Sequence, residues 1–177
     1  MNKKSAHVLG GNVLITALVL MIGTHNLHAG QPGSQRQLVL DGEAPLSQVI
    51  VPEPGYLFVI EFDLYSLDGE FAGKAVGRFF EVTPSDKPST ARRLRSDFTF
   101  NLPNGQVKAL VEIRELSLAS LPQPGASGHD ILQIVEGTIT AGSGDYTGAT
   151  GTVRGGGATE FTPEGVQMNL RFVLNLR

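Results

Sequence analysis

Apolar and polar residues alternate with a period of two along much of the chain. In the stretch 166–176, every second position is apolar, while Gln, Asn and Arg occupy most of the positions between. The same alternation recurs in 58–64, 98–102 and 107–113. This period is typical of β-strands that have one dry face and one wet face. We therefore predict that the dry faces of these stretches line one common interior.

The pattern predicts eight strands and no helix. Turn residues such as glycine, proline and Asn-Gly separate the strands, and Pro84 and Pro88 favour a loop over residues 83–93. The expected strands are Gln37–Asp41, Tyr56–Tyr65, Lys74–Val82, Asp97–Leu102, Gln106–Leu116, His129–Thr140, Thr150–Gly157 and Val166–Leu176. Short strands at regular spacing, joined by turns, favour a barrel or a sandwich. The prediction is one all-β domain.

A glycine-rich stretch lies between the sixth and seventh expected strands. Residues 139–157 read ITAGSGDYTGATGTVRGGG and include seven glycines. Glycine adopts positive φ without steric cost, and glycines inside strands mark kinks and close backbone approaches. The stretch therefore predicts a sharply turned hairpin with kinked strands, which is the geometry that a small closed barrel needs at its corners.

Residues 1–29 have the pattern of a secretory signal peptide. Lys3 and Lys4 supply a basic start, Val13–Ile22 is an uncharged apolar run, and Ala29 ends a cleavage site. The run is shorter than the roughly 20 residues of a membrane span, although an uncleaved anchor is the alternative. We expect residues 30–177 to be exported to the periplasm or the cell exterior, with no stable membrane insertion after cleavage. The chain has no cysteine, so no disulfide supports this domain.

Charge and residue types exclude several classes of function. Removing Lys3 and Lys4 takes the net charge from −3 to −5, which argues against a nucleic-acid partner. The basic cluster 92–95 lies in the expected loop and is interpreted as a solvated turn. The mature chain keeps one histidine, His129, and no cysteine, so neither a metal site nor a Ser-His-Asp triad with its G-x-S-x-G motif is expected.

A few charged residues are candidates for catalysis. Glu136 shares a face of its expected strand with Leu132 and Ile134, which would make it a lone carboxylate in an apolar interior. Desolvation there would suit Glu136 to general acid–base chemistry, with Arg154 or Arg78 as its partner. The alternative is an outward side chain or a structural ion pair.

Three ordered blocks carry a family resemblance. The glycine-rich stretch resembles the hairpin shared by allene oxide cyclases, plant dirigent proteins and their bacterial barrel relatives, with matches at Gly142, Ser143, Gly144, Tyr146, Gly148, Ala149 and Gly151. The blocks 64–77 and 98–107 are similar to the family's strand–turn–strand element and to the hairpin after it. Together the three blocks cover about residues 38–176.

The resemblance implies an eight-stranded antiparallel up-and-down β-barrel that works without metal or organic cofactor. It also implies a homo-oligomer, either a trimer or a dimer. Family members confine a reactive small molecule in the lumen and direct its cyclisation or coupling, which is an entropic effect. The expected function is that of a cofactor-free cyclase or isomerase acting on a hydrophobic small molecule. The alternatives are a dirigent-like or lipocalin-like binding protein without catalysis, and a structural barrel with a filled core.

The resemblance also suggests where a ligand would bind. Phe62 and Phe79 stand near positions at which the plant cyclases carry lumen residues, and Asp41 is the acid that the first strand offers, either in the lumen or as a turn cap beside Gly42. Tyr146 matches the family's aromatic residue, as a plug of the barrel corner or as a ligand contact. The predicted catalytic residues are Glu136, Arg154 and Asp41, and the predicted ligand-binding residues are Phe62, Phe79, Tyr146, Ile134, Phe98 and Phe172.

Overall fold

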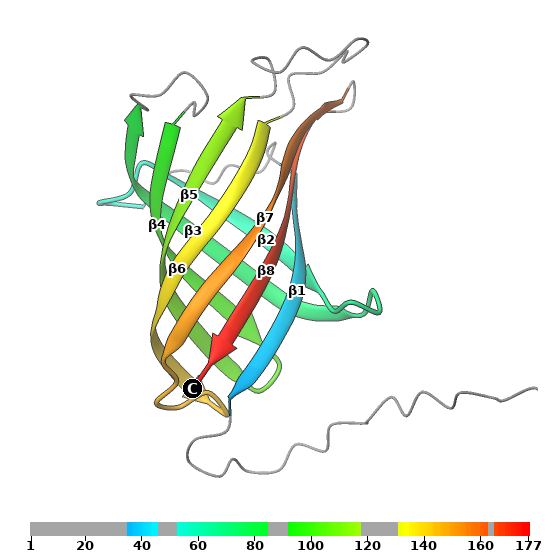
Figure 1. Ribbon diagram of the computed structural model, residues 1–177, viewed down its shortest axis with the longest axis vertical. Helices are drawn as coiled ribbons and strands as arrows, with labels where there is room; N and C mark the ends of the chain where they lie inside the picture. The colour runs from blue at the N-terminus through cyan, green and yellow to red at the C-terminus, as the bar shows by residue number, and fades with distance from the viewer. Residues whose placement is uncertain (1–34, 46–52, 85–91, 118–130, 163–164) are drawn as a thin grey trace, which may run out of the picture.

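The computed structural model describes residues 35–45, 53–84, 92–117, 131–162 and 165–177. These residues form a closed antiparallel barrel in which each strand pairs with its neighbours in the sequence (Figure 1). The strands are β1 (Arg36–Pro45), β2 (Phe58–Tyr65), β3 (Phe71–Pro84), β4 (Arg92–Leu102), β5 (Gly105–Ser117), β6 (Ile131–Gly144), β7 (Gly151–Thr162) and β8 (Gly165–Leu176). The predicted eight-stranded all-β barrel is therefore confirmed.

Several predictions fall on other parts of the chain. The signal peptide 1–29 and His129 lie outside the described residues. Within the described ranges, the structure contains no helix that could span a bilayer.

The pairing of β1 with β8 closes the barrel. It runs from Arg36 opposite Leu176 to Pro45 opposite Gln167. The turns 66–70, 103–104 and 145–150 join β2–β3, β4–β5 and β6–β7 at one end of the barrel, which we call the lower end. In Figure 1 the β4–β5 and β6–β7 turns lie at the bottom, and the β2–β3 turn projects to the right. At the upper end, β1, β3, β5 and β7 finish and β2, β4, β6 and β8 begin. Because the side chains of a strand point alternately to its two faces, every second residue of each strand faces the lumen.

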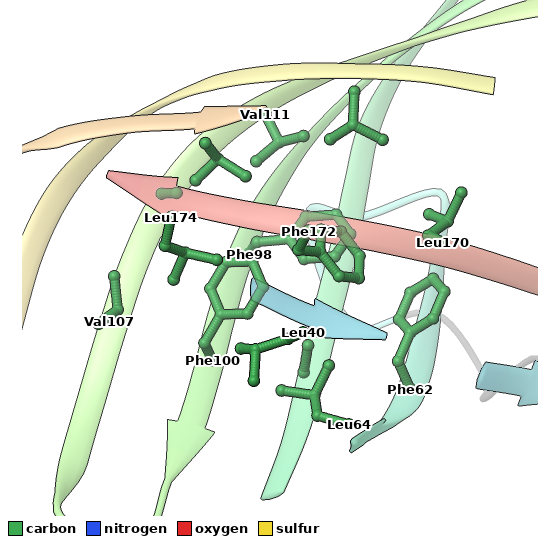
Figure 2. Close-up of a cluster of buried hydrophobic side chains, with 14 of the residues drawn as sticks. Leu40, Phe62, Leu64, Phe98, Phe100, Val107, Val111, Leu170, Phe172 and Leu174 are labelled. Carbon is green, nitrogen blue, oxygen red and sulfur yellow. The ribbon is translucent and has the colours of Figure 1, made fainter. Parts of the chain in front are cut away.

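Phenylalanine rings fill the middle of the lumen (Figure 2). The rings belong to Phe62, Phe79, Phe98, Phe100 and Phe172, and each is at most 1% exposed. The centroids of neighbouring rings lie 5.3–6.1 Å apart, in tilted or edge-on pairs. Glycines on neighbouring strands leave room for them: a Cβ on Gly42 would lie 2.7 Å from the Phe172 ring, and one on Gly77 would lie 2.7 Å from the Phe98 ring. The middle of the barrel is therefore a packed core.

The basic cluster 92–95 belongs to β4, so its predicted place in a loop is wrong. Leu94 is buried in the core at 2% exposure, and Arg95 on the outer face forms an ion pair of 2.9 Å with Glu81 on β3. Pro84 is the last residue of β3, where the missing N–H group costs the strand ladder little. Burial of Leu94 and the outward ion pair together outweigh the turn tendency of the sequence around 84–93.

The glycine-rich stretch forms the β6–β7 hairpin at the lower end, as predicted. Tyr146 in its turn is 6% exposed and belongs to the core, and the Arg36 guanidinium lies 5.2 Å from the centre of its ring. The backbone N–H of Asp145 donates to the carbonyl oxygen of Asn104, which ties this turn to the β4–β5 turn. Tyr146 thus closes the lower end of the lumen, as the plug interpretation predicts.

Candidate functional site

The structure places Glu136 on the outside of the barrel. The buried side chains of β6 are Gln133, Val135 and Ile139, whereas the side chain of Glu136 is 59% exposed and pairs with Arg114. The predicted lumen positions of Glu136 and of Ile134, which is 37% exposed, are therefore wrong. The register with β5 is the physical reason, because it sets Val135 opposite the buried Ile113. Glu136 instead forms an ion pair with Arg114 on the outer face, which agrees with the alternative interpretation.

The other two predicted catalytic residues also face outward. Arg154 is exposed and lies opposite Glu136 in the register of β6 and β7. Asp41 accepts hydrogen bonds of 2.7 and 2.9 Å from Arg171, and these bonds are the main reason that its pKa lies below the ordinary value of 3.8. Of the two alternatives for Asp41, the lumen position is therefore wrong, and its place within β1 also excludes the turn cap. The apolar environment that was expected to activate Glu136 does not surround it.

Of the residues predicted to bind a ligand, Phe62, Phe79, Phe98 and Phe172 do face the lumen. They contact one another in the packed middle of the barrel, and Tyr146 lies below them at the lower end. Their role as ligand contacts stays a prediction. Because these rings occupy the space that a ligand in mid-lumen would need, a ligand would have to bind at one of the two ends or on the outer surface.

A hollow of about 430 Å³ lies at the upper end of the lumen, and we call it the upper hollow. It combines an apolar wall with a polar one. Its lining residues are Arg92, Glu115, Ile131, Thr159, Phe161, Val166 and Met168. These residues come from β4, β5, β6, β7 and β8, whose upper ends can be followed side by side in Figure 1. The upper hollow is thus built by five adjacent strands of the closed barrel.

Glu115 is the most unusual residue of the upper hollow. It is 2% exposed and is paired with Arg92, which lies directly opposite on β4 and whose side chain is 49% exposed. Removing a carboxylate from water costs several kcal/mol even when it is paired, and an apolar pair of similar size is often as stable. Most buried side chains of the lumen are apolar, and Glu115 departs from that pattern. Such departures are expected at functional sites.

Gln133 on β6 continues the polar row of Arg92 and Glu115. It lies opposite Glu115 in the register and is 2% exposed. Its Nε2 donates a hydrogen bond of 3.1 Å to Oγ1 of Thr159, while its buried Oε1 has no hydrogen-bond partner among the described residues. A buried acceptor without a donor is costly and calls for an explanation in a native structure. By contrast, the buried Oγ of Ser96 donates to the carbonyl oxygen of Val111 at 3.3 Å.

The polar row was missed in the sequence for different reasons. Glu115 continues the period of two that runs from Val107 to Ile113, so extending that pattern by one step would have found it. Gln133 lies in the opposite phase to Leu132 and Ile134, which the prediction for Glu136 took as the buried phase. Arg92 fell in the expected loop. Only the phase and the pairing of the strands bring these three residues together.

A second hollow, of about 520 Å³, lies on the outer surface across β3 to β6. Several of its polar groups are paired: Tyr56 donates to Asp97 at 3.2 Å, and Arg78 forms an ion pair of 2.9 Å with Glu53. Burial, and secondly the hydrogen bond to Asp97, raise the pKa of the Tyr56 phenol. The outer hollow offers no buried, unpartnered group among the described residues, so we take the upper hollow as the candidate site.

Comparison with known proteins does not assign the chain to a family. No family model matches the chain, and no curated protein matches its sequence. The resemblance to the allene oxide cyclase and dirigent barrels therefore stays a prediction, and the function has to be argued from the site.

Proposed function

We propose that this barrel binds a hydrophobic small molecule in the upper hollow. The observation that carries the proposal is the hollow itself, which sets the half-exposed Arg92 and the buried Glu115 and Thr159 against an apolar wall. The apolar wall consists of Ile131, Phe161, Val166 and Met168. Ligand sites are concave, mostly apolar, and supplied with a few fixed polar groups, and about 430 Å³ lies within their usual range of roughly 300–1,000 Å³. The ligand would sit above the phenylalanine layer instead of within it.

Binding of a neutral apolar dye tests this proposal. The fluorescence of N-phenyl-1-naphthylamine reports binding when the dye is excited at wavelengths that protein side chains, including an introduced tryptophan, do not absorb. We expect the dye to bind, and Val166→Trp, which fills the upper hollow, to weaken binding at least about tenfold, a loss of about 1.4 kcal/mol. Leu67→Trp is the matched control, because Leu67 is 63% exposed in the β2–β3 turn at the lower end. If the two variants bound the dye with equal affinity, the dye would bind at a place other than the upper hollow.

A cofactor-free cyclase or isomerase is the second candidate function. The observation that favours it is the carboxylate of Glu115, which is almost fully buried and lines the upper hollow. The Glu115 carboxyl group could exchange a proton with a ligand, and confinement in the hollow would select one reactive conformer.

Glu115→Gln separates catalysis from binding, because it keeps the shape of the side chain and removes its basicity. Cyclisation and isomerisation conserve mass, so the assay follows pairs of isobaric peaks in a metabolite extract incubated with the protein. If the barrel is an enzyme, the wild-type protein exchanges such a pair and the variant does so about 10²- to 10⁴-fold more slowly. Affinity for the dye should stay within a few-fold of wild type. An extract that the wild-type protein leaves unchanged speaks against catalysis and leaves the binding proposal standing.

A further inference from the structure

We infer that the upper hollow selects neutral amphiphiles whose polar end carries an O–H or N–H donor, and that Gln133 determines this specificity. The inference rests on the proposed function, because it names the chemical class of ligand for the same site. Three features of the site support it: the balance of its charges, the unpaired oxygen of Gln133, and the apolar wall.

The charges in the upper hollow cancel. Among its lining residues, Arg92 and Glu115 are the charged ones, and they already pair with each other. An anionic head group that approached Arg92 would also face the carboxylate of Glu115, with which Arg92 is already paired, while a cationic head group would have to compete with Arg92 for Glu115. Leaving one member of a buried pair without its partner is strongly unfavourable. A neutral head group disturbs neither residue.

The free hydrogen-bonding group deeper in the site is an acceptor, so it favours a ligand that carries a donor. Gln133 lies behind Thr159: its amide nitrogen donates to the Thr159 hydroxyl, and Thr159 lines the hollow whereas Gln133 does not. A head group would reach the Gln133 amide by displacing the Thr159 side chain. There the free Oε1 can only accept. The carboxylate of Glu115, opposite Gln133 in the register, is a second acceptor. A ligand that only accepts hydrogen bonds would leave the Gln133 oxygen unsatisfied, whereas a hydroxyl or amide N–H would satisfy it.

The apolar wall accommodates the other end of such a molecule. Phe161 and Val166 face each other across β7 and β8, and Phe161 is 45% exposed, so the wall continues from the interior to the rim. Met168 lies deeper, at 4% exposure, and its flexible thioether side chain adapts to chains of different shape. An alkyl or terpenoid chain with one neutral donor at its end fits both walls.

Displacement of N-phenyl-1-naphthylamine by matched ten-carbon probes tests the inference. The probes are decan-1-ol, decyl methyl ether, decanoate and decylammonium, each used below its aggregation limit. We expect decan-1-ol to bind at least tenfold more tightly than the ether, which lacks the donor, and at least tenfold more tightly than either ion. Equal binding of the alcohol and the ether, or tighter binding of an ion, would overturn the inference while the proposed function stood. If neither the dye nor any probe bound, the proposed function itself would fail.

Gln133→Met then assigns the preference to one residue, because methionine has nearly the length of glutamine and no acceptor of comparable strength. The variant should bind decan-1-ol about tenfold more weakly and the ether as tightly as wild type does. Gln106→Met is the matched control, since Gln106 is exposed on the outer face of β5, and it should change neither affinity. If Gln133→Met kept the preference for the alcohol, the assignment to Gln133 would be wrong. The comparison of alcohol and ether on the wild-type protein remains decisive even if this variant does not fold.

Discussion

Replacement of Phe172 by alanine is expected to lower the free energy of unfolding by about 3–5 kcal/mol. The ring is fully buried, and its centroid lies 5.3–5.7 Å from those of Phe62, Phe98 and Phe100. Truncation removes these contacts, and Gly42 on β1, which lies against the ring, has no side chain of its own to fill the space. A cavity in the middle of a closed barrel cannot collapse without bending several paired strands, so the cost should fall in the upper part of the range.

Urea unfolding, followed by circular dichroism, measures this effect. Leu110→Ala is the matched control, because Leu110 is 37% exposed on the outer face of β5, where such changes usually cost within about 0.5 kcal/mol. If Phe172→Ala cost no more than Leu110→Ala, the packed middle of the lumen would be refuted. In that case a ligand chamber in mid-lumen, as the family resemblance implies, would become the better hypothesis.

Replacement of Gly142 by alanine should destabilise the barrel by about 3 kcal/mol or more, the upper end of what overpacking costs. A Cβ at this position would overlap the carbonyl oxygen of Tyr146, which lies in the turn that closes the lower end. That oxygen is backbone and accepts a hydrogen bond of 2.9 Å from Ala149. It cannot turn away as a flexible side chain could, so the whole β6–β7 turn would have to shift.

The control for this prediction is Gly148→Ala in the same turn. Gly148 has φ of +78°, but a Cβ added to it would have no atom within 4 Å, so only backbone strain of about 1–2 kcal/mol is expected. Urea midpoints of the two variants decide the comparison, and failure of Gly142→Ala to fold also agrees with the prediction. A stability of Gly142→Ala within about 1 kcal/mol of wild type would show that close backbone approach does not explain the glycine at this position.

The middle of the lumen is packed with rings, whereas its upper end carries polar side chains. In the middle of the barrel, glycines opposite the rings let aromatic side chains occupy the interior, as at Gly77 beneath Phe98. Near the upper end, Ser96, Glu115, Gln133 and Thr159 replace apolar residues at buried positions. Chemistry that needs polar groups in a confined space is therefore best placed at the upper end, where the hollow is.

The alternation of residues was enough to predict most of the fold. Along β8, apolar residues occupy one phase without exception from Val166 to Leu176, and the buried positions follow that phase. Along β6 both phases contain apolar residues, because Leu132 and Ile134 compete with Val135 and Ile139. A period of two cannot choose between two such faces, and a wrong choice reverses every side chain of the strand. That single reversal moved Glu136 into the lumen and Gln133 out of it.

By itself, the sequence determined the all-β class, the number and order of the strands, the glycine turn and most of the apolar interior. Each of these depends on local rules: the pleat of a strand, the conformational range of glycine and the cost of exposing apolar surface. Only the tertiary structure decided which face of β6 is buried, where Arg92 belongs, and that Arg92, Glu115 and Gln133 stand in one row. Those features depend on register between strands, and register is set by the packing of the whole barrel, which no single segment encodes.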